Sequence, residues 1–223
     1  MKVIYEDNHL IIINKNPGEL SQSDKTRDLS LVDKTKEYLK AKYQKKGNVY
    51  LGLVNRLDRP TSGLIIFSKT SKCLARMNKL QKLRKIKKTY LAIIENPPHD
   101  KSGQLTNYLK KNQTKNKSFV TNRNDPKSKK AVLYYKLLKT LKNYFLLEVE
   151  LETGRHHQIR CQLSHIKCFI KGDLKYGAKR SNRDKSICLH SYKIEFKHPV
   201  SNKELSIIAL SLIHISEPTR PVT

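Results

Sequence analysis

The segment at residues 54–70, VNRLDRPTSGLIIFSKT, places the strongest constraint on how this chain can fold. Pro60 fixes one backbone angle, and Gly63 permits a conformation that other residues avoid. The apolar run at 64–67 that follows predicts a buried strand. We therefore expect a rigid turn anchored by a core strand, and this turn carries a single carboxylate, Asp58.

Asp58 stands between two cations, Arg56 and Arg59, and nearby positive charge favours the ionised form of an acid. An acid in a Pro/Gly turn has two interpretations. It is a turn former or a surface salt-bridge partner, or it is an anion that the turn holds in place for chemistry. The turn alone leaves both interpretations open, so the flanking sequence has to decide.

Six segments, in chain order, together resemble the RluA-type pseudouridine synthases. The family signature His-Arg-Leu-Asp-x-x-Thr-Ser-Gly is matched at 56–58 and 61–63, with Asn55 where histidine is usual. The other segments are INKNPGEL (13–20), KKTYLAI (87–93), ETGRHHQIR (152–160), IKGDLKYGA (170–178) and LHSYKIEFKHP (189–199). The resemblance covers residues 1–209.

The resemblance implies an enzyme that isomerises uridine to pseudouridine in ribosomal or transfer RNA. It implies that Asp58 is the essential carboxylate, that Arg160 pairs with it, and that Tyr90 lies against the target base. The candidate residues for RNA contact are Arg56, Arg59, Lys88, Arg155 and His156.

Isomerisation breaks the bond from ribose C1′ to N1, rotates the uracil and joins C1′ to C5, so it needs no cofactor. Asp58 can assist by attacking the ribose or by removing a proton from C2′, and the sequence leaves both routes open. The uridine must also leave its stack. Arg56 is a candidate to fill the vacated space, with a phosphate contact or a turn salt bridge as the alternative.

Composition independently favours an RNA partner. The chain has 46 Lys plus Arg against 19 Asp plus Glu, a formal net charge of +27 over 223 residues. A charge of this size attracts polyanions. The sequence has no apolar stretch of about 18 residues, the length that crosses a membrane, and its start lacks the apolar core of a signal peptide. We expect a cytoplasmic protein that does not bind membranes.

No metal or nucleotide cofactor is expected. The four cysteines lack Cys-x-x-Cys spacing, and the histidines at 156, 157 and 165 have no acids or thiols at a fitting distance in sequence. Nucleotide-binding glycine loops are also missing. Because nothing resembles a heptad seam, a monomer is the default expectation.

Hydrophobic spacing predicts three helices. The first covers 31–43, with Ser30 as its cap and a buried face that includes 41–43. The second follows Ser71, with a stripe at 74, 77, 80 and 83. In the third, the stripe at 159, 163 and 166 is buried, and His156 and Arg160 share another face, one turn apart.

Alternating or apolar runs predict strands at 10–14, 90–95, 131–138 and 144–151, the last two forming a hairpin around Thr140. Residues 96–103 and 112–130 are expected to be polar connections that face RNA. The predicted fold class is α+β: a single pseudouridine synthase-like catalytic domain, built on a mixed, mainly antiparallel sheet flanked by helices.

Residues 1–210 form the predicted catalytic domain. After Leu210 the sequence SLIHISEPTRPVT departs from the family pattern. We expect 211–223 to be a non-native or disordered tail.

Three alternatives to an active synthase remain. The first is a basic RNA-binding protein without catalytic activity, which the charge alone would explain. The second is a glycosidase-like hydrolase, which needs paired carboxylates; Asp173 and Asp184 lie in a Gly- and Lys-rich loop without a pairing signature. The third is an impaired synthase, because of Asn55 and of the unusual C-terminal sequence. Asparagine retains hydrogen-bonding capacity, so the loop is expected to keep its shape.

Overall fold

A sheet of 11 strands forms the centre of the computed structural model, which describes residues 1–24 and 28–210. The strand order is β1-β2-β4-β10-β5-β9-β8-β6-β7, with β3 pairing with β4 and β11 pairing with β10. The strands are β1 (Lys2–Glu6), β2 (Leu10–Lys15), β3 (Gly52–Leu53), β4 (Ser62–Ser68), β5 (Lys87–Ile94), β6 (Ser102–Asn112), β7 (Lys117–Thr121), β8 (Lys129–Thr140), β9 (Phe145–Leu151), β10 (Leu189–Lys197) and β11 (Glu204–Ile208). Among the described strands, β10 runs parallel to β4, and the other pairs are antiparallel. The expected mixed, mainly antiparallel sheet is confirmed.

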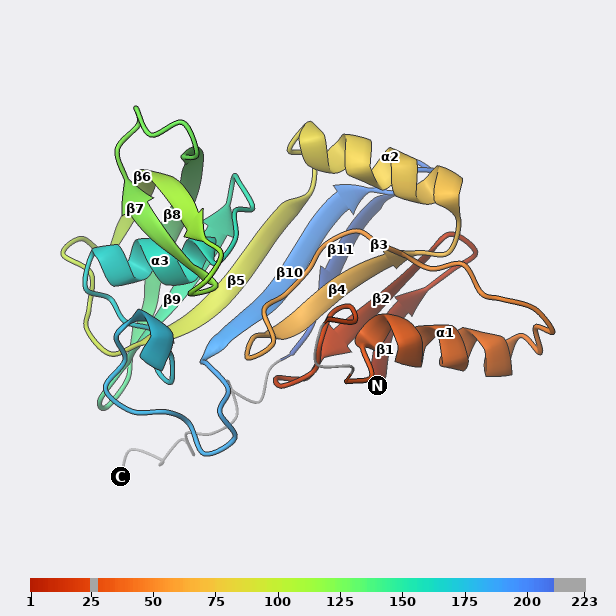
Figure 1. The fold of residues 1–223 in the computed structure, drawn as a ribbon, viewed down its shortest axis with the longest axis horizontal. Coiled ribbons are helices and arrows are strands. Elements are labelled where there is room, and N and C mark those ends of the chain that lie inside the picture. The colour runs from red at the N-terminus through yellow and green to blue at the C-terminus, as the bar shows by residue number, and fades with distance from the viewer. Residues whose placement is uncertain (25–27, 211–223) are drawn as a thin grey trace, which may run out of the picture.

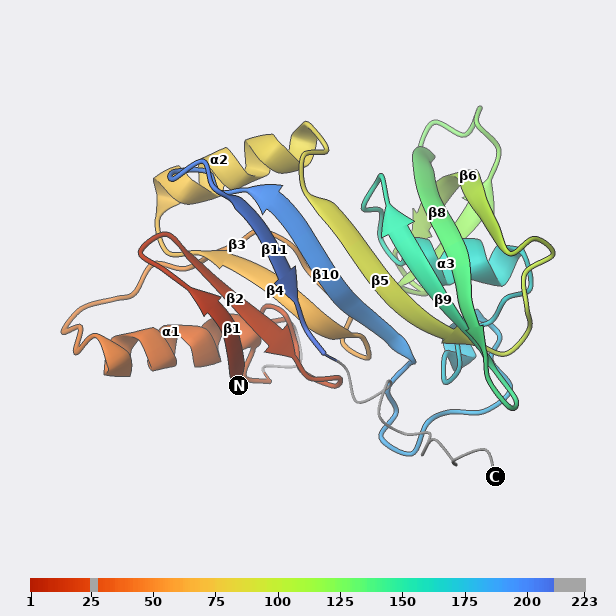
Figure 2. The ribbon, with the colours of Figure 1, turned by 180° about the vertical axis from the view of Figure 1, so that it is seen from behind.

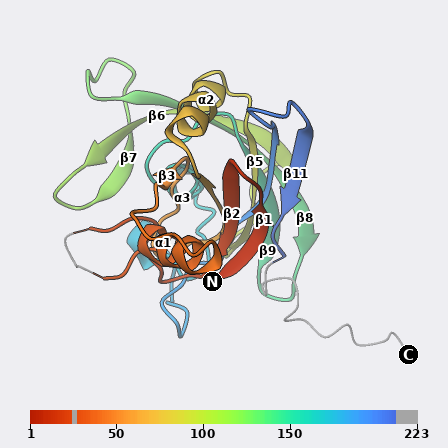
Figure 3. The ribbon, with the colours of Figure 1, turned by 90° about the vertical axis from the view of Figure 1, so that its right-hand side faces the viewer.

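The helices divide between two halves of the sheet. Helices α1 (Leu31–Lys42) and α2 (Ser71–Lys82) lie with β1 to β4, whereas α3 (Gln158–His165) lies beside β6 to β9 (Figures 1 and 2). Viewed from the β1 end, α1 lies on one side of the β1–β2 hairpin and β11 on the other (Figure 3). Strands β5 and β10 lie at the middle of the sheet and join the two halves.

The first helix forms where its cap and spacing predict. Ser30 and Asp33 make a capping box, in which each side chain accepts a hydrogen bond from the other residue's backbone N–H. Leu31, Thr35 and Leu39 are buried. The expectation that 41–43 share this buried face is wrong: all three are exposed, because the helix ends there and Tyr43 is its C-cap.

The predicted stripe of α2 is only partly correct. Cys73 and Met77, four residues apart, are its fully buried side chains, and Leu74 and Leu80 are half-buried. Leu83 is 54% exposed because it lies at the C-cap, beyond the last helical residue. A spacing of three drifts around a helix that has 3.6 residues per turn, so four such positions cannot share one face.

The first half of the sheet is buried on both faces, against a separate core cluster on each side. On β2, Ile11 and Ile13 belong to a cluster that includes Leu31 and Leu39 of α1. The alternate residues Leu10 and Ile12 belong to a second cluster, which includes Met77 of α2. A strand that is buried on both faces holds its neighbours firmly, and β2 pairs directly with β4.

The predicted hairpin around Thr140 is confirmed, since β8 and β9 pair in antiparallel register down to Thr140 opposite Phe145. The expectation of a loop across 112–130 is wrong, because β7 lies within it and pairs with β6. Residues 96–101 form an irregular connection, and β6 begins at Ser102. The prediction for the tail concerns 211–223, which lie outside the described residues. No described helix is long and apolar enough to span a membrane.

Candidate active site

The loop that carries Asp58 enters β4 through Gly63. Gly63 has a φ of 113°, in the left-handed region, and lies opposite Ser191 in the parallel pairing of β4 with β10. A Cβ at this position would lie 2.4 Å from the Ser191 carbonyl oxygen. Only glycine allows this approach, so Gly63 sets where the loop meets the centre of the sheet.

The last residue of β2 and the segment that follows it hold the same loop in place. The Lys15 ammonium group is fully buried and donates to the Arg59 carbonyl oxygen at 3.1 Å, and the Gly18 amide donates to that oxygen at 2.8 Å. The Ser21 hydroxyl donates to the Leu57 carbonyl oxygen at 2.7 Å. Burial lowers the pKa of Lys15 to about 8. These contacts explain why the INKNPGEL segment belongs with the Asp58 motif.

Asn55, the departure from the family signature, is buried and bonded at both ends of its amide. Its Nδ2 donates to the Leu64 carbonyl oxygen at 3.3 Å, and its Oδ1 accepts from the Ile66 amide at 2.8 Å. The side chain therefore ties the loop to β4, as expected from its hydrogen-bonding capacity.

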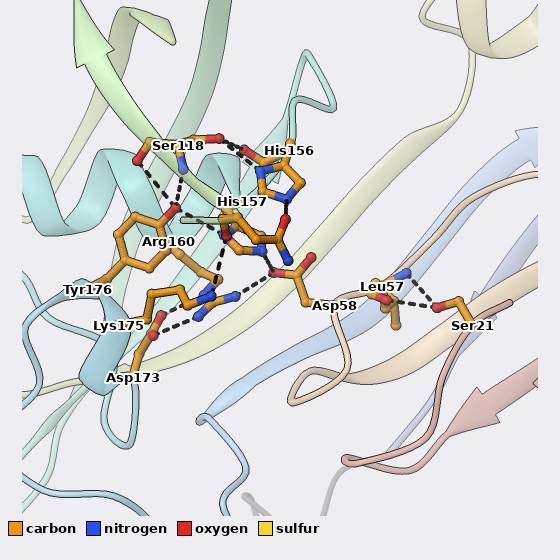
Figure 4. A network of polar contacts seen from close by, with 11 residues as sticks. Ser21, Leu57, Asp58, Ser118, His156, His157, Arg160, Asp173, Lys175 and Tyr176 are labelled. Atoms are coloured by element: carbon orange, nitrogen blue, oxygen red, sulfur yellow. Dashed lines mark hydrogen bonds and ion pairs between the residues drawn. The ribbon is translucent and has the colours of Figure 1, made fainter. Parts of the chain in front are cut away.

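Asp58 faces Arg160 across the two halves of the molecule (Figure 4). Nη1 of Arg160, on α3, lies 2.8 Å from Oδ2 of Asp58. The Arg160 side chain is 5% exposed and that of Asp58 is 27% exposed, so the carboxylate can still reach a substrate. Within the described residues, neither Arg56 nor Arg59 forms an ion pair with Asp58, although both neighbour it in sequence.

Asp173 binds the other two nitrogens of the Arg160 guanidinium. Nε donates to Oδ2 at 2.6 Å and Nη2 donates to Oδ1 at 2.7 Å, and Asp173 is 1% exposed. Although burial opposes charge, these hydrogen bonds and the nearby carboxylates raise the pKa of Arg160. The sequence analysis considered Asp173 only as a possible second carboxylate of a hydrolase and did not predict its pairing with Arg160. Its signal was the GDLKYG run, where Gly172 takes a φ of 88° and turns the chain at Asp173.

The expected helical face shared by His156 and Arg160 is also wrong, because α3 begins at Gln158. His157 is its N-cap in a left-handed conformation, with a φ of 52°. Its Nε2 lies 3.4 Å from Oδ2 of Asp58, and its Nδ1 lies 3.0 Å from the Tyr176 hydroxyl. The sequence analysis did not predict this approach of His157 to Asp58.

The two neighbouring histidines are stacked, with ring centroids 3.8 Å apart. Burial lowers the pKa of His157 to about 3 and that of His156 to about 4. Both rings are therefore neutral near pH 7. Arg160 is then the fixed positive charge that contacts Asp58, and a neutral ring lies beside the pair.

Asp58, Tyr90 and Arg160 line one pocket, of about 70 Å³, together with Arg56, Thr61 and Arg155. Tyr90 on β5 is 7% exposed, and burial raises its pKa to about 12, so its hydroxyl stays protonated. Among the described residues, no group of three or more His, Cys, Asp or Glu side chains is placed to hold a metal ion.

A family model described as RNA pseudouridylate synthase matches residues 9–165. The chain belongs to this family. The resemblance and the enzyme class expected from the sequence are thus confirmed, and the family's substrate class is RNA.

Relatives of this synthase include the "Ribosomal large subunit pseudouridine synthase C" of Rickettsia bellii, which is 35% identical over 209 residues. The match covers 93% of this chain and 67% of that protein. The protein of the same name from Buchnera aphidicola subsp. Baizongia pistaciae is 32% identical over 215 residues, covering 93% of this chain and 66% of its own length. The chain thus spans about two thirds of the length of these relatives.

Solved structures share the synthase fold. "Human RNA Pseudouridylate Synthase Domain Containing 4" superposes with a TM-score of 0.78 at 22% identity, covering 94% of this chain and 88% of the human one. "Human RNA Pseudouridylate Synthase Domain Containing 1" gives 0.76 at 18% identity, covering 95% and 83%. The α+β fold predicted for the catalytic domain is confirmed.

The synthase places its candidate RNA contacts differently around the pocket. Arg56 is exposed at the pocket, and Arg155 lines it while its Nε donates to the Lys130 carbonyl oxygen at 3.0 Å. Arg59 instead binds the Gly18 carbonyl oxygen and pairs with Asp28 at 2.8 Å, so its charge is partly used within the protein.

Two further candidates are partly buried. The His156 ring contacts the Ser118 hydroxyl at 2.9 Å and the Asn116 amide oxygen at 3.1 Å. Lys88 lies two residues before Tyr90 on β5, and burial lowers its pKa to about 8. The RNA contacts of all five candidates, and the catalytic roles of Asp58, Arg160 and Tyr90, stay predictions.

Proposed function

We propose that this protein isomerises uridine to pseudouridine in large-subunit ribosomal RNA, with Asp58 as the essential carboxylate. The observation that carries the proposal is the Asp58–Arg160 pair, in which a partly exposed carboxylate is oriented by a buried guanidinium at an open pocket. The names of the relatives support ribosomal RNA as the substrate. Transfer RNA is the second candidate that the sequence resemblance implies.

In the reaction, the C1′–N1 bond of uridine breaks, uracil turns, and C1′ bonds to C5. The proton that C5 loses is balanced by the one that N1 gains, so no oxidant or reductant takes part. Asp58 either attacks the ribose or removes the C2′ proton, and both routes require its ionised form. Arg160 holds that carboxylate through one hydrogen bond and leaves its other oxygen available to the ribose.

The pocket beside Asp58 is small. Its volume of about 70 Å³ lies well below the roughly 300–1,000 Å³ of sites that enclose a drug-sized ligand. The extruded uridine therefore rests against Tyr90 and Asp58 in an open cleft. Since extrusion from a stack costs a few kcal/mol, contacts outside this pocket must hold the rest of the RNA strand.

Asp173 bears on the hydrolase alternative. A glycosidase needs two carboxylates that both reach the sugar. Asp173 is nearly inaccessible, and Arg160 binds both of its oxygens. Asp58 is left as the carboxylate that a ribose can approach from the pocket, which favours isomerisation with one carboxylate.

We also infer a cytoplasmic monomer that acts without a cofactor. The side chains proposed for catalysis come from one chain, and the four cysteines at 73, 161, 168 and 188 are free thiols, as a reducing compartment maintains. Light scattering of the purified protein checks the oligomeric state: a single mass near 25.9 kDa is expected.

Mapping pseudouridine in ribosomal and transfer RNA, from cells with and without the gene, tests the proposal. Deletion should remove at least one pseudouridine from large-subunit ribosomal RNA, and the wild-type gene should restore it whereas Asp58→Asn should not. Loss confined to transfer RNA would reassign the substrate. Identical maps would contradict the proposal, and restoration by Asp58→Asn would contradict the role of Asp58 as the essential carboxylate.

A further inference from the structure

A second pocket, of about 410 Å³, lies along the segment between α3 and β10. Its lining contains three cations, Lys171, Lys179 and Arg180, together with the ring of Tyr144 and one carboxylate, Glu95. Apart from these groups the lining is neutral and polar. It is far larger than the pocket at Asp58 and shares no lining residue with it.

The cations of the second pocket are not neutralised within the described part of the chain. None of Lys171, Lys179 and Arg180 forms an ion pair there, and the Lys171 ammonium lies 4.4 Å from the centroid of the Tyr144 ring. The Glu95 carboxylate accepts hydrogen bonds from the Lys179 backbone amide at 3.1 and 3.3 Å. The pocket therefore has a net positive charge and suits an anionic ligand.

The walls of the second pocket are held by hydrogen bonds before any ligand arrives. The Lys171 amide donates to the Ile93 carbonyl oxygen on β5 at 2.9 Å, and the Lys171 carbonyl oxygen accepts from the Cys188 amide at 2.9 Å. The Asn182 side chain donates to the Ser186 carbonyl oxygen at 3.0 Å. A preformed anionic site binds with less loss of conformational entropy.

This segment is also tied to the candidate active site at both ends. Asp173, which holds Arg160, follows Lys171 by two residues, so their Cα atoms are at most about 7 Å apart. Near the other end, the Ile187 amide donates to the Pro60 carbonyl oxygen at 3.2 Å, in the loop that carries Asp58. An RNA strand whose nucleotide occupies the first pocket can thus continue along this segment.

We propose that the second pocket binds the phosphate backbone of single-stranded RNA next to the target uridine. The proposal rests on the function proposed above and names where the flanking strand is held. Lys171 covers one face of the Tyr144 ring, and three of the groups that line the pocket are cations. The pocket therefore binds phosphates by charge, and sequence readout is not expected from it.

The test compares two charge-reversal variants of equal net charge. The pocket variant is Lys179→Glu with Arg180→Glu, both exposed positions in the pocket rim. The control is Lys45→Glu with Lys46→Glu, exposed cations just beyond α1 on the other half of the sheet. Fluorescence anisotropy at several salt concentrations measures binding of two uridine-containing single-stranded RNAs, of about 5 and about 20 nucleotides.

The pocket variant should bind the long RNA at least about tenfold more weakly than the control does, with the salt slope reduced by about 1.4, or 0.7 for each of two lost phosphate contacts. Both variants should bind the short RNA alike. Equal weakening of the long RNA in both variants would show an effect of bulk charge and overturn the proposal. Unchanged binding of the long RNA by the pocket variant would overturn it too.

Pseudouridine formation separates this proposal from the one on which it rests. If the pocket variant binds the long RNA more weakly than the control variant, as expected, but the wild-type protein forms no pseudouridine, the proposed function fails and the RNA site stands. If the wild-type protein forms pseudouridine and the pocket variant keeps its KM for the long RNA, the RNA site fails and the function stands.

Discussion

Replacing Asp173 with asparagine tests whether this buried carboxylate positions Arg160. Arg160 donates two hydrogen bonds to Asp173 and one to Asp58. Asparagine keeps the shape but removes the charge, and its amide hydrogens then face guanidinium hydrogens. Breaking a buried ion pair on one side costs about 3–5 kcal/mol. Because Arg160 retains Asp58, we expect the lower end of that range, about 3 kcal/mol.

At about 2–4 °C per kcal/mol for a domain of this size, the melting temperature of Asp173→Asn should fall by about 6–12 °C. Urea unfolding measures the loss, and kinetics on RNA should show a fall in kcat that exceeds any rise in KM, since Asp173 is too buried to touch substrate. Asp184→Asn is the matched control. Asp184 is exposed in the same segment and accepts hydrogen bonds from Ser186, so its loss should stay within about 0.5 kcal/mol.

The outcome that refutes this reasoning is specific. If Asp173→Asn unfolds within about 0.5 kcal/mol of the wild type and keeps its kcat, Arg160 does not depend on Asp173. Equal destabilisation by the Asp184 control would show that the whole segment is sensitive, and that the ion pair is not the cause.

Three other predictions follow from the same contacts. Arg160→Lys keeps the charge but loses the planar fork, so its turnover should fall sharply, whereas the turnover of Arg155→Lys should stay near that of the wild type. Arg160→Ala should also lose stability, because it leaves Asp173 buried without a cation. A larger loss of turnover in Arg155→Lys than in Arg160→Lys would contradict the site. RNA affinity should fall steeply with salt, with a log–log slope of about −0.7 per phosphate contacted, and an affinity that is flat in salt would contradict a phosphate-binding surface. The pKa values of His156 and His157 are lowered in the folded state, so below pH about 6.5, the pKa of an unfolded histidine, the unfolded chain binds protons that the native state does not bind. The free energy of unfolding should therefore fall from pH 6.5 toward 4, and it should fall less in His157→Gln. Equal pH profiles for the wild type and His157→Gln would contradict these buried neutral rings.

Elements with strong local signals were predictable from the sequence. The Ser30 cap, the apolar run of β4 and the alternation in β8 and β9 each specify structure within a few residues. Strand β7 was not predictable, because its residues Lys117–Thr121 are mostly polar and it is a strand through pairing with β6. A polar strand of this kind is set by its neighbour in space.

The candidate site divides in the same way. Asp58, Arg160 and Tyr90 belong to motifs, so the resemblance identified them before any geometry was known. Asp173 joins Arg160 through the fold: the GDLKYG run indicates a turn at Asp173 but does not indicate which cation the buried carboxylate binds. His156 was misplaced because the left-handed backbone of His157 delays the start of α3 to Gln158, two residues later than the spacing of His156 and Arg160 suggests.

The most direct test of the central claim uses purified wild-type protein and Asp58→Asn on ribosomal RNA from cells that lack the gene. Mass spectrometry of the digested RNA measures the pseudouridine formed, and anisotropy measures binding. The wild-type protein should form pseudouridine, whereas Asp58→Asn should form none and should bind RNA within a few-fold of wild type, because only one charge at the pocket is changed. Measurable turnover by Asp58→Asn would contradict the account.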